Sequence, residues 1–332
     1  MSKLNLLPSL RILFALSLLV SLAAPAAHAS GGQLQEIKVA VSAVDPAGGY
    51  REDLTTGGFK VQLGDEPAAV TSVVAPQGDL ILLVVMDVIG DLGRIDTARQ
   101  ALVQQLEELG ARQYVSVLQA QDGLQVVQDP TQDRKRLREA ILNLPVAGSP
   151  GLMGAVEQAT AIGDSMLRKS DVRVAVLFIT DGSIYRYRGD YTSPVINPSD
   201  NSDLSRRFRD RLIQEKISTI VSSLSTSVTP LFFLHLESHT DPLNAVYENG
   251  IQQFSQATAG EAIFCRSLAE IPTQLTLLID RIRNLYTLTV RASAPPGRRL
   301  RLAVEHADSP GLIHRDHLEI PSQHLPAEPT QE

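Results

Sequence analysis

Tryptophan is absent from this chain of 332 residues, and aromatic residues make up only 5% of it. Such a chain offers few aromatic platforms on which nucleic-acid bases could stack. Basic residues are also in the minority, because 30 Lys and Arg stand against 37 Asp and Glu, for a formal net charge of -7. Proteins that bind nucleic acid usually carry a strongly basic face. The composition therefore argues against nucleic acid as a partner.

Cysteine is nearly absent as well. Cys265 is the only one, so no disulfide can form within the chain. It lies in the apolar run EAIFCRS, which is typical of a buried core thiol. A thiol nucleophile needs an activating base, and the neighbouring sequence supplies none.

Long apolar runs are missing too, since a membrane span needs about 20 residues. The N-terminal run at 12–22 is shorter; it follows a short basic segment and precedes Ala-His-Ala at 27–29. This order is typical of a secretory signal peptide. We expect residues 1–29 to be removed after Ala29, which leaves an exported, periplasmic or secreted chain with no transmembrane segment. An uncleaved membrane anchor is the alternative.

The middle of the chain alternates apolar runs with helical patterns. LILLVVMD, YVSVLQA, VRVAVLFITD and TPLFFLHLE are predicted to be buried strands. RIDTARQALVQQLEEL, which starts at residue 94, DRKRLREAILNL and LMGAVEQATAIGDSMLRKS have the spacing of amphipathic helices, and Asp133 is a possible N-cap of the second. GLQVVQD is expected to be a short edge strand. Alternating strands and helices over residues 78–284 predict an α/β fold, a Rossmann-like doubly wound and mostly parallel sheet.

The two flanks of this region have a different pattern of apolar and polar residues. IKVAVSAV and FKVQLG in residues 33–77, and LYTLTVRAS and RRLRLAVEH in residues 285–321, alternate apolar and polar residues like half-buried strands. Each flank is too small to enclose a core alone. We therefore predict that they join in one small antiparallel β-sandwich, with the sheet domain inserted between them. Residues 322–332 are expected to form a loose tail.

Two of the predicted buried strands end in an aspartate. Asp87 ends LILLVVMD, and Asp181 ends VRVAVLFITD. Ligands of an open parallel sheet bind outside the carboxyl ends of its strands, so both carboxylates are expected at one crevice. Asp91 follows Asp87 after a tight turn at Gly90, and the loop GSPGL, which contains Ser149, opens a helix near the same edge.

LILLVVMDVIGD, AGSPGLMGAV and AVLFITDG together resemble the motifs of the von Willebrand factor type A domain. The resemblance covers residues 78–284, and the flanks resemble those of exported bacterial proteins that carry such a domain. It implies a metal-ion-dependent adhesion site for Mg²⁺, built from an Asp-x-Ser-x-Ser turn, a Thr loop and a strand ending Thr-Asp-Gly. On this resemblance Asp87, Asp91 and Asp181 are candidate metal ligands.

The chain departs from the family's motif at the hydroxyl positions. Ile89 stands at the first Ser, Asp91 at the second, and Pro150 aligns with the Thr. Mg²⁺ takes six oxygen ligands in near-octahedral geometry, so the remaining carboxylates would form a degenerate, water-rich site. The alternative is that these aspartates cap backbone N–H groups at helix starts.

A polar insertion follows Gly182 directly. It is rich in Tyr and Arg, which are enriched at interface hot spots, although a plain surface loop is the alternative. We predict a non-enzymatic protein-binding module of the bacterial cell envelope, of adhesion or scaffold type, with an unknown protein partner at this edge. The candidate contact residues are Ser149, Gly182, Ser183, Tyr185, Tyr187 and Arg188.

Two other functions stay open at this point. One is Mg²⁺-dependent ligand binding through the three carboxylates. The other is a hydrolase that uses Asp87 and Asp181 for acid–base chemistry. No nucleophile elbow, zinc triad or phosphate loop lies near these residues in the sequence.

Overall fold

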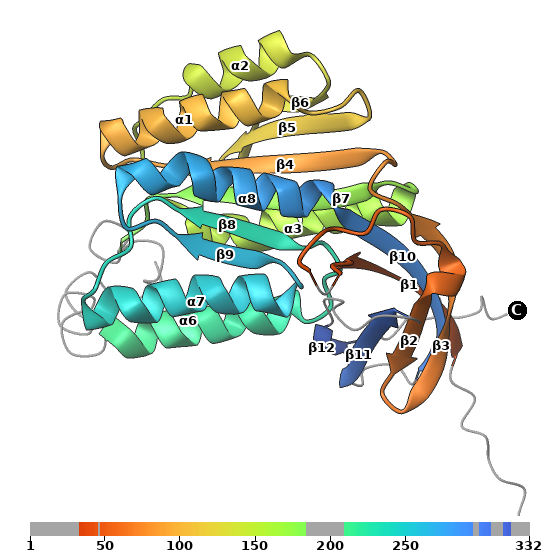
Figure 1. The fold of residues 1–332 in the computed structure, drawn as a ribbon. Helices are drawn as coiled ribbons and strands as arrows, with labels where there is room; N and C mark the ends of the chain where they lie inside the picture. Colours follow the sequence, from red (N-terminus) through yellow and green to blue (C-terminus); the bar gives the residue numbers. More distant parts are fainter. Residues whose placement is uncertain (1–32, 46, 184–208, 295–298, 307–314, 320–332) are drawn as a thin grey trace, which may run out of the picture. The chain divides into compact units, whose positions relative to one another are not determined.

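The computed structural model describes residues 33–45, 47–183, 209–294, 299–306 and 315–319. The predicted signal peptide, 1–29, and the predicted tail, 322–332, lie outside these residues. The described chain forms two six-stranded sheets, one of them covered by helices (Figure 1). None of its helices is both long and apolar enough to cross a membrane, within the part of the chain that is described.

The first sheet has the order β6-β5-β4-β7-β8-β9, and all its neighbours are parallel except β5 and β6. Its strands are β4 (Leu80–Asp87), β5 (Gln113–Gln119), β6 (Gln125–Thr131), β7 (Arg173–Thr180), β8 (Leu231–His235) and β9 (Glu261–Phe264). The sheet confirms the predicted Rossmann-like, doubly wound and mostly parallel arrangement, with β6 as its antiparallel edge strand.

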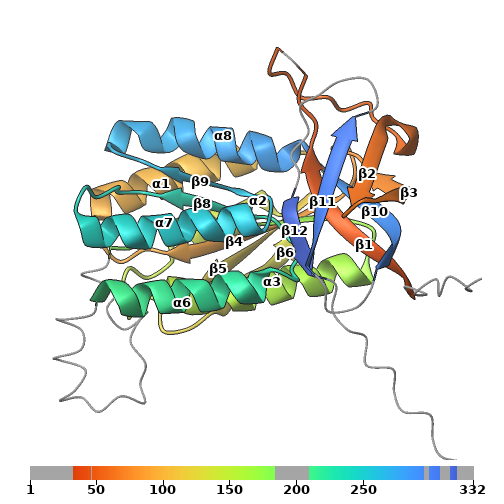
Figure 2. The same ribbon diagram turned by 90° about the horizontal axis from the view of Figure 1, so that it is seen from below.

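Helices cover both faces of this sheet (Figure 2). One face carries α1 (Leu92–Glu107), α2 (Arg134–Leu142) and α8 (Ile271–Arg283), and the other carries α3 (Leu152–Lys169), α6 (Arg209–Leu224) and α7 (Pro242–Ala257). In β4, Leu82 and Val84 pack into the first layer, whereas Leu83 and Val85 pack into the second. Burial on both sides explains why this strand is apolar without alternation.

The flanks meet in the second sheet, which has the order β1-β10-β3-β2-β11-β12 and antiparallel pairing throughout. Its strands are β1 (Gln33–Ser42), β2 (Phe59–Leu63), β3 (Glu66–Val74), β10 (Leu285–Ala294), β11 (Arg299–His306) and β12 (Arg315–Glu319). Short 3-10 helices lie at η1 (Thr56–Gly58) and η2 (Leu268–Glu270). As predicted, neither flank forms its sheet alone, because β10 pairs with both β1 and β3.

One apolar cluster holds the second sheet together. Alternate residues of four of its strands contribute to it, among them Val39, Val61, Leu288 and Val304. Strands from both flanks contribute to this cluster, so the two flanks share one core.

Arg173, the first residue of β7, ties together the two connections between the sheets. Its guanidinium donates hydrogen bonds to four carbonyls: those of Pro76 and Gly78 before β4, that of Arg283 at the end of α8, and that of Leu285 at the start of β10. Its side chain is buried, and burial lowers its pKa to about 10. The side chain therefore stays charged at neutral pH.

Candidate functional site at the carboxyl edge of the sheet

The last paired residues of three central strands form one row. Asp87 of β4 lies beside Thr180 of β7, and Thr180 lies beside His235 of β8. All three are fully buried. Because these strands are parallel, their carboxyl ends meet here, and Asp181 follows Thr180 at the same edge.

Asp87 links the end of β7 to the start of α3. Its Oδ1 accepts the backbone N–H of Gly151 at 3.1 Å, and its Oδ2 accepts the hydroxyl of Thr180 at 3.2 Å. The Thr180 hydroxyl oxygen in turn accepts the N–H of Gly182 at 3.1 Å. The carboxylate is therefore engaged with neighbouring loops of the protein itself.

Asp181 caps the turn that follows β4. Its carboxylate accepts the N–H of Ile89 at 3.1 Å and also that of Gly90. Its own N–H donates to the carbonyl of Asp87 at 3.4 Å. Ile89 stands where the family's motif has a hydroxyl, and here it contributes only its main-chain N–H.

Asp91 is the N-cap of α1. Its Oδ1 accepts the N–H of Arg94 at 3.0 Å, and the residue is exposed, unlike Asp87 and Asp181. No three His, Cys, Asp or Glu side chains come together as a possible metal site among the described residues. Ile89 and Pro150 carry no side-chain oxygen. The residues at this edge do not fit the oxygen shell that Mg²⁺ requires.

The loop before α3 is pinned to the β5–β6 turn. The Asp122 carboxylate accepts the N–H of Ser149 at 2.8 Å, and the Asp122 N–H donates to the Ser149 carbonyl at 2.9 Å. A Cβ at Gly151 would lie 2.3 Å from the carbonyl oxygen of Ala120, so only glycine fits there. Ser149 itself is exposed at this edge.

His235 holds the turn after β7. Its Nε2 lies 2.6 Å from the Gly182 carbonyl, and its Nδ1 accepts the N–H of Glu237 at 3.3 Å. These two contacts require a neutral ring with the proton on Nε2. Burial lowers the pKa of His235 to about 4, which agrees with a neutral ring.

Some features of the site are not apparent from motifs. The roles of Thr180 and His235 become visible only when the strands are aligned, although His235 ends its strand as Asp87 ends another. Gly182 and Ser183 are buried, and a Cβ at Gly182 would lie 3.1 Å from the Tyr247 hydroxyl oxygen. Tyr185, Tyr187 and Arg188 lie outside the described residues.

Two exposed leucines lie at the same edge. Leu92 opens α1 after Asp91 and is 62% exposed, and Leu268 opens η2 after β9 and is 46% exposed. They lie on neighbouring elements, because a Cβ at Gly93 would lie 3.8 Å from Cδ1 of Leu268. We call Leu92 and Leu268 the leucine pair.

A charged pair lies beside the leucine pair. Arg94 follows Leu92 in the first turn of α1, where it donates to the Leu236 carbonyl at 2.8 Å and lies 3.5 Å from the carboxylate of Glu237. The edge therefore presents apolar and charged groups next to one another.

Neither buried carboxylate is placed for acid–base catalysis. A general acid or base must come within hydrogen-bonding distance of its substrate. Asp87 and Asp181 are buried, and their oxygens accept the protein's own N–H and O–H groups. Cys265 is buried as predicted, and burial raises the pKa of its thiol to about 11, which keeps it protonated.

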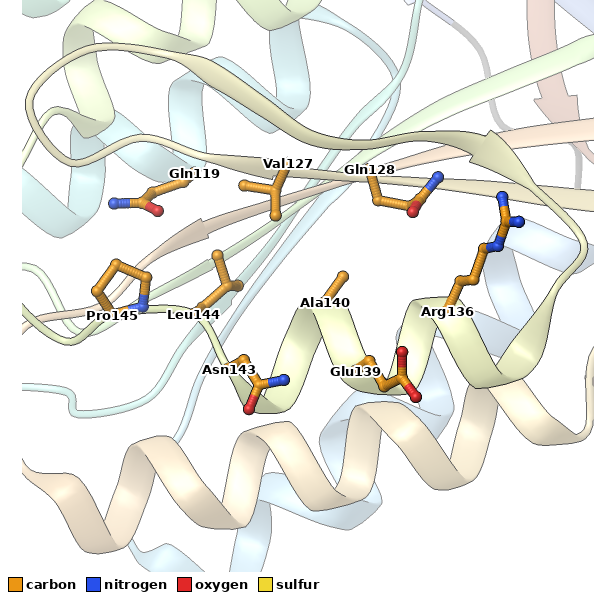
Figure 3. Close-up of a pocket in the computed structure, with 9 residues that line it drawn as sticks. All are labelled: Gln119, Val127, Gln128, Arg136, Glu139, Ala140, Asn143, Leu144 and Pro145. Carbon is orange, nitrogen blue, oxygen red and sulfur yellow. The ribbon is translucent and has the colours of Figure 1, made fainter.

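A separate groove of about 360 Å³ lies between the β5–β6 hairpin and α2 (Figure 3). In Figure 3, side chains of the hairpin lie across the groove from those of the helix. It is lined by Gln119, Val127, Gln128, Arg136, Glu139, Ala140, Asn143, Leu144 and Pro145. It contains none of the residues of the carboxyl edge described above.

No protein-family model matches this chain, and no curated protein does. Solved structures match it. One is a von Willebrand factor type A protein from Catenulispora acidiphila, with 12% identity, a TM-score of 0.43, and coverage of 89% of this chain and 76% of that chain. The fold is similar to the von Willebrand factor type A fold.

Two further solved structures resemble the chain. The conserved hypothetical protein BatB from Bacteroides thetaiotaomicron has 11% identity and a TM-score of 0.39, and the match covers 62% of this chain and 98% of that chain. Proximal thread matrix protein 1 from the mussel byssus, solved with a zinc-occupied MIDAS motif, has 12% identity and a TM-score of 0.38, with coverage of 61% and 47%. The zinc-occupied motif is a property of that protein.

Proposed function

We propose that this chain is a non-enzymatic protein-binding module of the bacterial cell envelope, which holds a protein partner at the carboxyl edge of its parallel sheet. The observation that carries the proposal is the leucine pair, Leu92 and Leu268. Both are substantially exposed, and they lie on adjacent elements at this edge. The predicted signal peptide at 1–29 supports a location in the envelope.

Burial of the leucine pair would drive the contact. Covering a fully exposed leucine contributes about 1.5–3 kcal/mol, and a partner would cover the exposed part of each. The surrounding polar groups suit the rim of an interface, which is polar and open to water. They include the Arg94–Glu237 pair and the exposed Ser149.

The Tyr- and Arg-rich insertion adds candidate contacts next to this edge. It follows Ser183, which is buried just beyond the end of β7. Tyr185, Tyr187 and Arg188 belong to the residue types that most often dominate binding energy at interfaces. We propose these three residues as contacts next to the end of β7, and the exposed Ser149 as a further contact beside the β5–β6 turn. Gly182 and Ser183 are buried, so they are not included among the contact residues.

The state of the two strand-end aspartates supports a non-enzymatic role. Asp87 and Asp181 stabilise loops by accepting hydrogen bonds from within the protein. A hydrolase would need at least one of these carboxylates to face its substrate. These hydrogen bonds also fix the loops in place. Binding a partner on loops that are already fixed costs less conformational entropy.

A quantitative pull-down from the envelope fraction tests the leucine pair. Leu268→Glu and Leu92→Glu should each lower retention of the captured partner by about tenfold or more, since each places a charge in the centre of the contact. Leu277→Glu is the matched control, because Leu277 is 47% exposed but lies on α8. Equal retention by all three variants and the wild-type protein would reject this edge as the binding surface.

The insertion is tested separately with a Tyr185→Ala, Tyr187→Ala, Arg188→Ala triple variant. If the insertion contacts the partner, the triple variant should lose binding while its thermal unfolding stays unchanged. Retention at the wild-type level would show that the insertion is not part of the interface. The Leu92 and Leu268 variants would still test the leucine pair independently.

A further inference from the structure

We propose that Asp87 and Asp181 replace a bound cation at the carboxyl edge: their hydrogen bonds hold the surrounding loops in place, so the edge keeps its shape without a divalent metal. This inference does not depend on the proposed protein contact. It concerns how the edge is held together, which can be measured on the purified protein alone.

Four donors meet the two buried carboxylates. Asp181 accepts the N–H groups of Ile89 and Gly90, and Asp87 accepts the Gly151 N–H and the Thr180 hydroxyl. Hydrogen bonds to an ionised acceptor are about twice as strong as those between neutral groups. These donors offset the cost of removing the two carboxylates from water, because a buried polar group needs hydrogen-bond partners.

Each carboxylate joins segments that are distant in the sequence. Asp181 connects the end of β7 to the turn after β4, and Asp87 connects the end of β4 to the start of α3 and to Thr180. In an adhesion site of the family's type, a cation would join these same segments. Here direct hydrogen bonds make the connection.

The residues that would have to ligate a cation are unsuited to it. Ile89 offers no oxygen in its side chain, and Pro150 offers neither a hydroxyl nor an N–H. Asp91 uses its carboxylate to cap α1 through the N–H of Arg94. Mg²⁺ needs near-octahedral oxygen ligands, and these three positions do not supply them.

The loop that contains Pro150 is also fixed by the protein. Asp122 holds Ser149 on one side of Pro150, and Asp87 holds Gly151 on the other. Gly151 packs so closely against the Ala120 carbonyl that no larger residue fits. The loop therefore has two carboxylate anchors of its own.

Thermal unfolding of the purified protein in EDTA, in millimolar Mg²⁺ and in millimolar Mn²⁺ tests the inference. The midpoint should agree within about 1 °C in all three conditions, because only a ligand that binds the folded state raises it. Isothermal titration calorimetry with the same two ions should give no binding heat. A rise of several degrees in the wild-type midpoint that Asp181→Asn abolishes would overturn the proposal.

Asp181→Asn tests the role of the carboxylate directly. The amide can accept only one of the two N–H groups and turns an NH₂ toward the other, so the midpoint should fall by about 5 °C with or without metal. Asp171→Asn is the control: its side chain is 87% exposed and its surface ion pair with Lys38 contributes little, so the midpoint should fall by no more than about 2 °C. An unchanged midpoint in Asp181→Asn would also overturn the proposal.

A gain-of-function variant provides an independent measurement. Ile89→Ser, Asp91→Ser and Pro150→Thr together restore the three hydroxyls of the family's motif. This variant should acquire a metal-dependent rise in its unfolding midpoint that the wild-type protein lacks. If the triple variant does not fold, the wild-type titration and Asp181→Asn still decide the question. Pull-downs repeated in EDTA show separately whether a partner binds. Failure of the metal inference can then be distinguished from failure of the proposed function.

Discussion

At the scale of single residues, His235 is the buried group at the carboxyl edge whose charge state matters most. Both ring nitrogens are engaged, one with the Gly182 carbonyl and the other with the Glu237 N–H. A second proton would place an N–H donor on Nδ1, opposite the N–H of Glu237. The structure therefore tolerates only the neutral ring.

This arrangement predicts a specific loss of stability in acid. The pKa of His235 falls from 6.5 to about 4 on folding, so the unfolded chain takes up the proton first. The contribution of His235 is complete above pH 6.5 and is lost as the pH falls toward 4; it amounts to about 3 kcal/mol. Urea unfolding of the wild-type protein and of His235→Gln between pH 7 and 4 measures it. The variant should be less stable than the wild-type protein at pH 7 but should lose less stability as the pH falls to 4. Parallel pH profiles of the two proteins would contradict the prediction.

Gly151 gives a second residue-scale prediction. An alanine there would place its Cβ 2.3 Å from the Ala120 carbonyl oxygen and would disturb the hydrogen bond to Asp87. Gly151→Ala should therefore destabilise the protein by about 2 kcal/mol or more. Gly154→Ala is the control within α3, because nothing lies within 4 Å of its Cβ position. It should leave stability equal or raise it by up to about 1 kcal/mol, as measured by denaturant unfolding.

The sequence predicts part of this site for a clear reason. Asp87 and Asp181 are expected at one edge because each ends an apolar run, and parallel strands end on the same side. Their donors are not predictable in this way. Ile89 and Gly151 act through backbone N–H groups, so their side-chain identity carries little information about the contact. For Asp91 the helix-capping interpretation agrees with the structure.

At the scale of elements, local signals predict the helices and strands well. Asp133 is an example: the sequence indicates it as an N-cap, and it accepts the N–H groups of Lys135 and Arg136 at the start of α2. The first residue of α1 is predicted less accurately. The apolar spacing suggests residue 94, but the helix begins at Leu92, an exposed residue that does not follow the buried pattern.

Arg173 gives the prediction at this scale, because one side chain joins the connections before β4 and after α8. Arg173→Met removes donors from four carbonyls, including those of Gly78 and Arg283, and should destabilise the protein by about 3 kcal/mol. Arg112→Met is the control, since the exposed Arg112–Asp79 pair should contribute about 0.2–1 kcal/mol. Equal midpoints for the two variants in urea unfolding would show that Arg173 does not hold these connections.

At the scale of the whole molecule, the position of β10 decides how the flanks depend on each other. The sequence predicts that the flanks meet, but strand order follows from pairing between residues that are far apart in the chain. Val39 pairs with Leu288, and Leu288 also pairs with Val73. The two N-terminal strands β1 and β3 are therefore joined through a C-terminal strand. We propose that residues 78–284 form an inserted domain. Residues 33–77 and 285–321 form the sheet into which it is inserted, which we call the host sheet.

Truncation tests this organisation. A chain that ends at Leu285 loses β10 to β12 but keeps the contacts of Arg173 with Arg283 and Leu285. It also keeps the two apolar layers that cover the parallel sheet. We expect its N-terminal flank to lose protection from proteolysis, because β1 loses its partner β10 and the apolar cluster of the flank sheet loses Leu288 and Val304.

Limited proteolysis followed by mass spectrometry should then yield a resistant fragment that begins near residue 78. A chain truncated after Glu319, which removes only residues beyond β12, is the control and should keep strands β1 to β3, β10 and β11 protected from cleavage. Two results would count against the inserted-domain organisation. Unfolding of the whole truncated chain would mean that the parallel sheet depends on the flanks, and continued protection of residues 33–77 would mean that β10 is dispensable for the N-terminal strands. A protected fragment from about residue 78 would establish that the host sheet needs both flanks whereas the inserted domain needs neither.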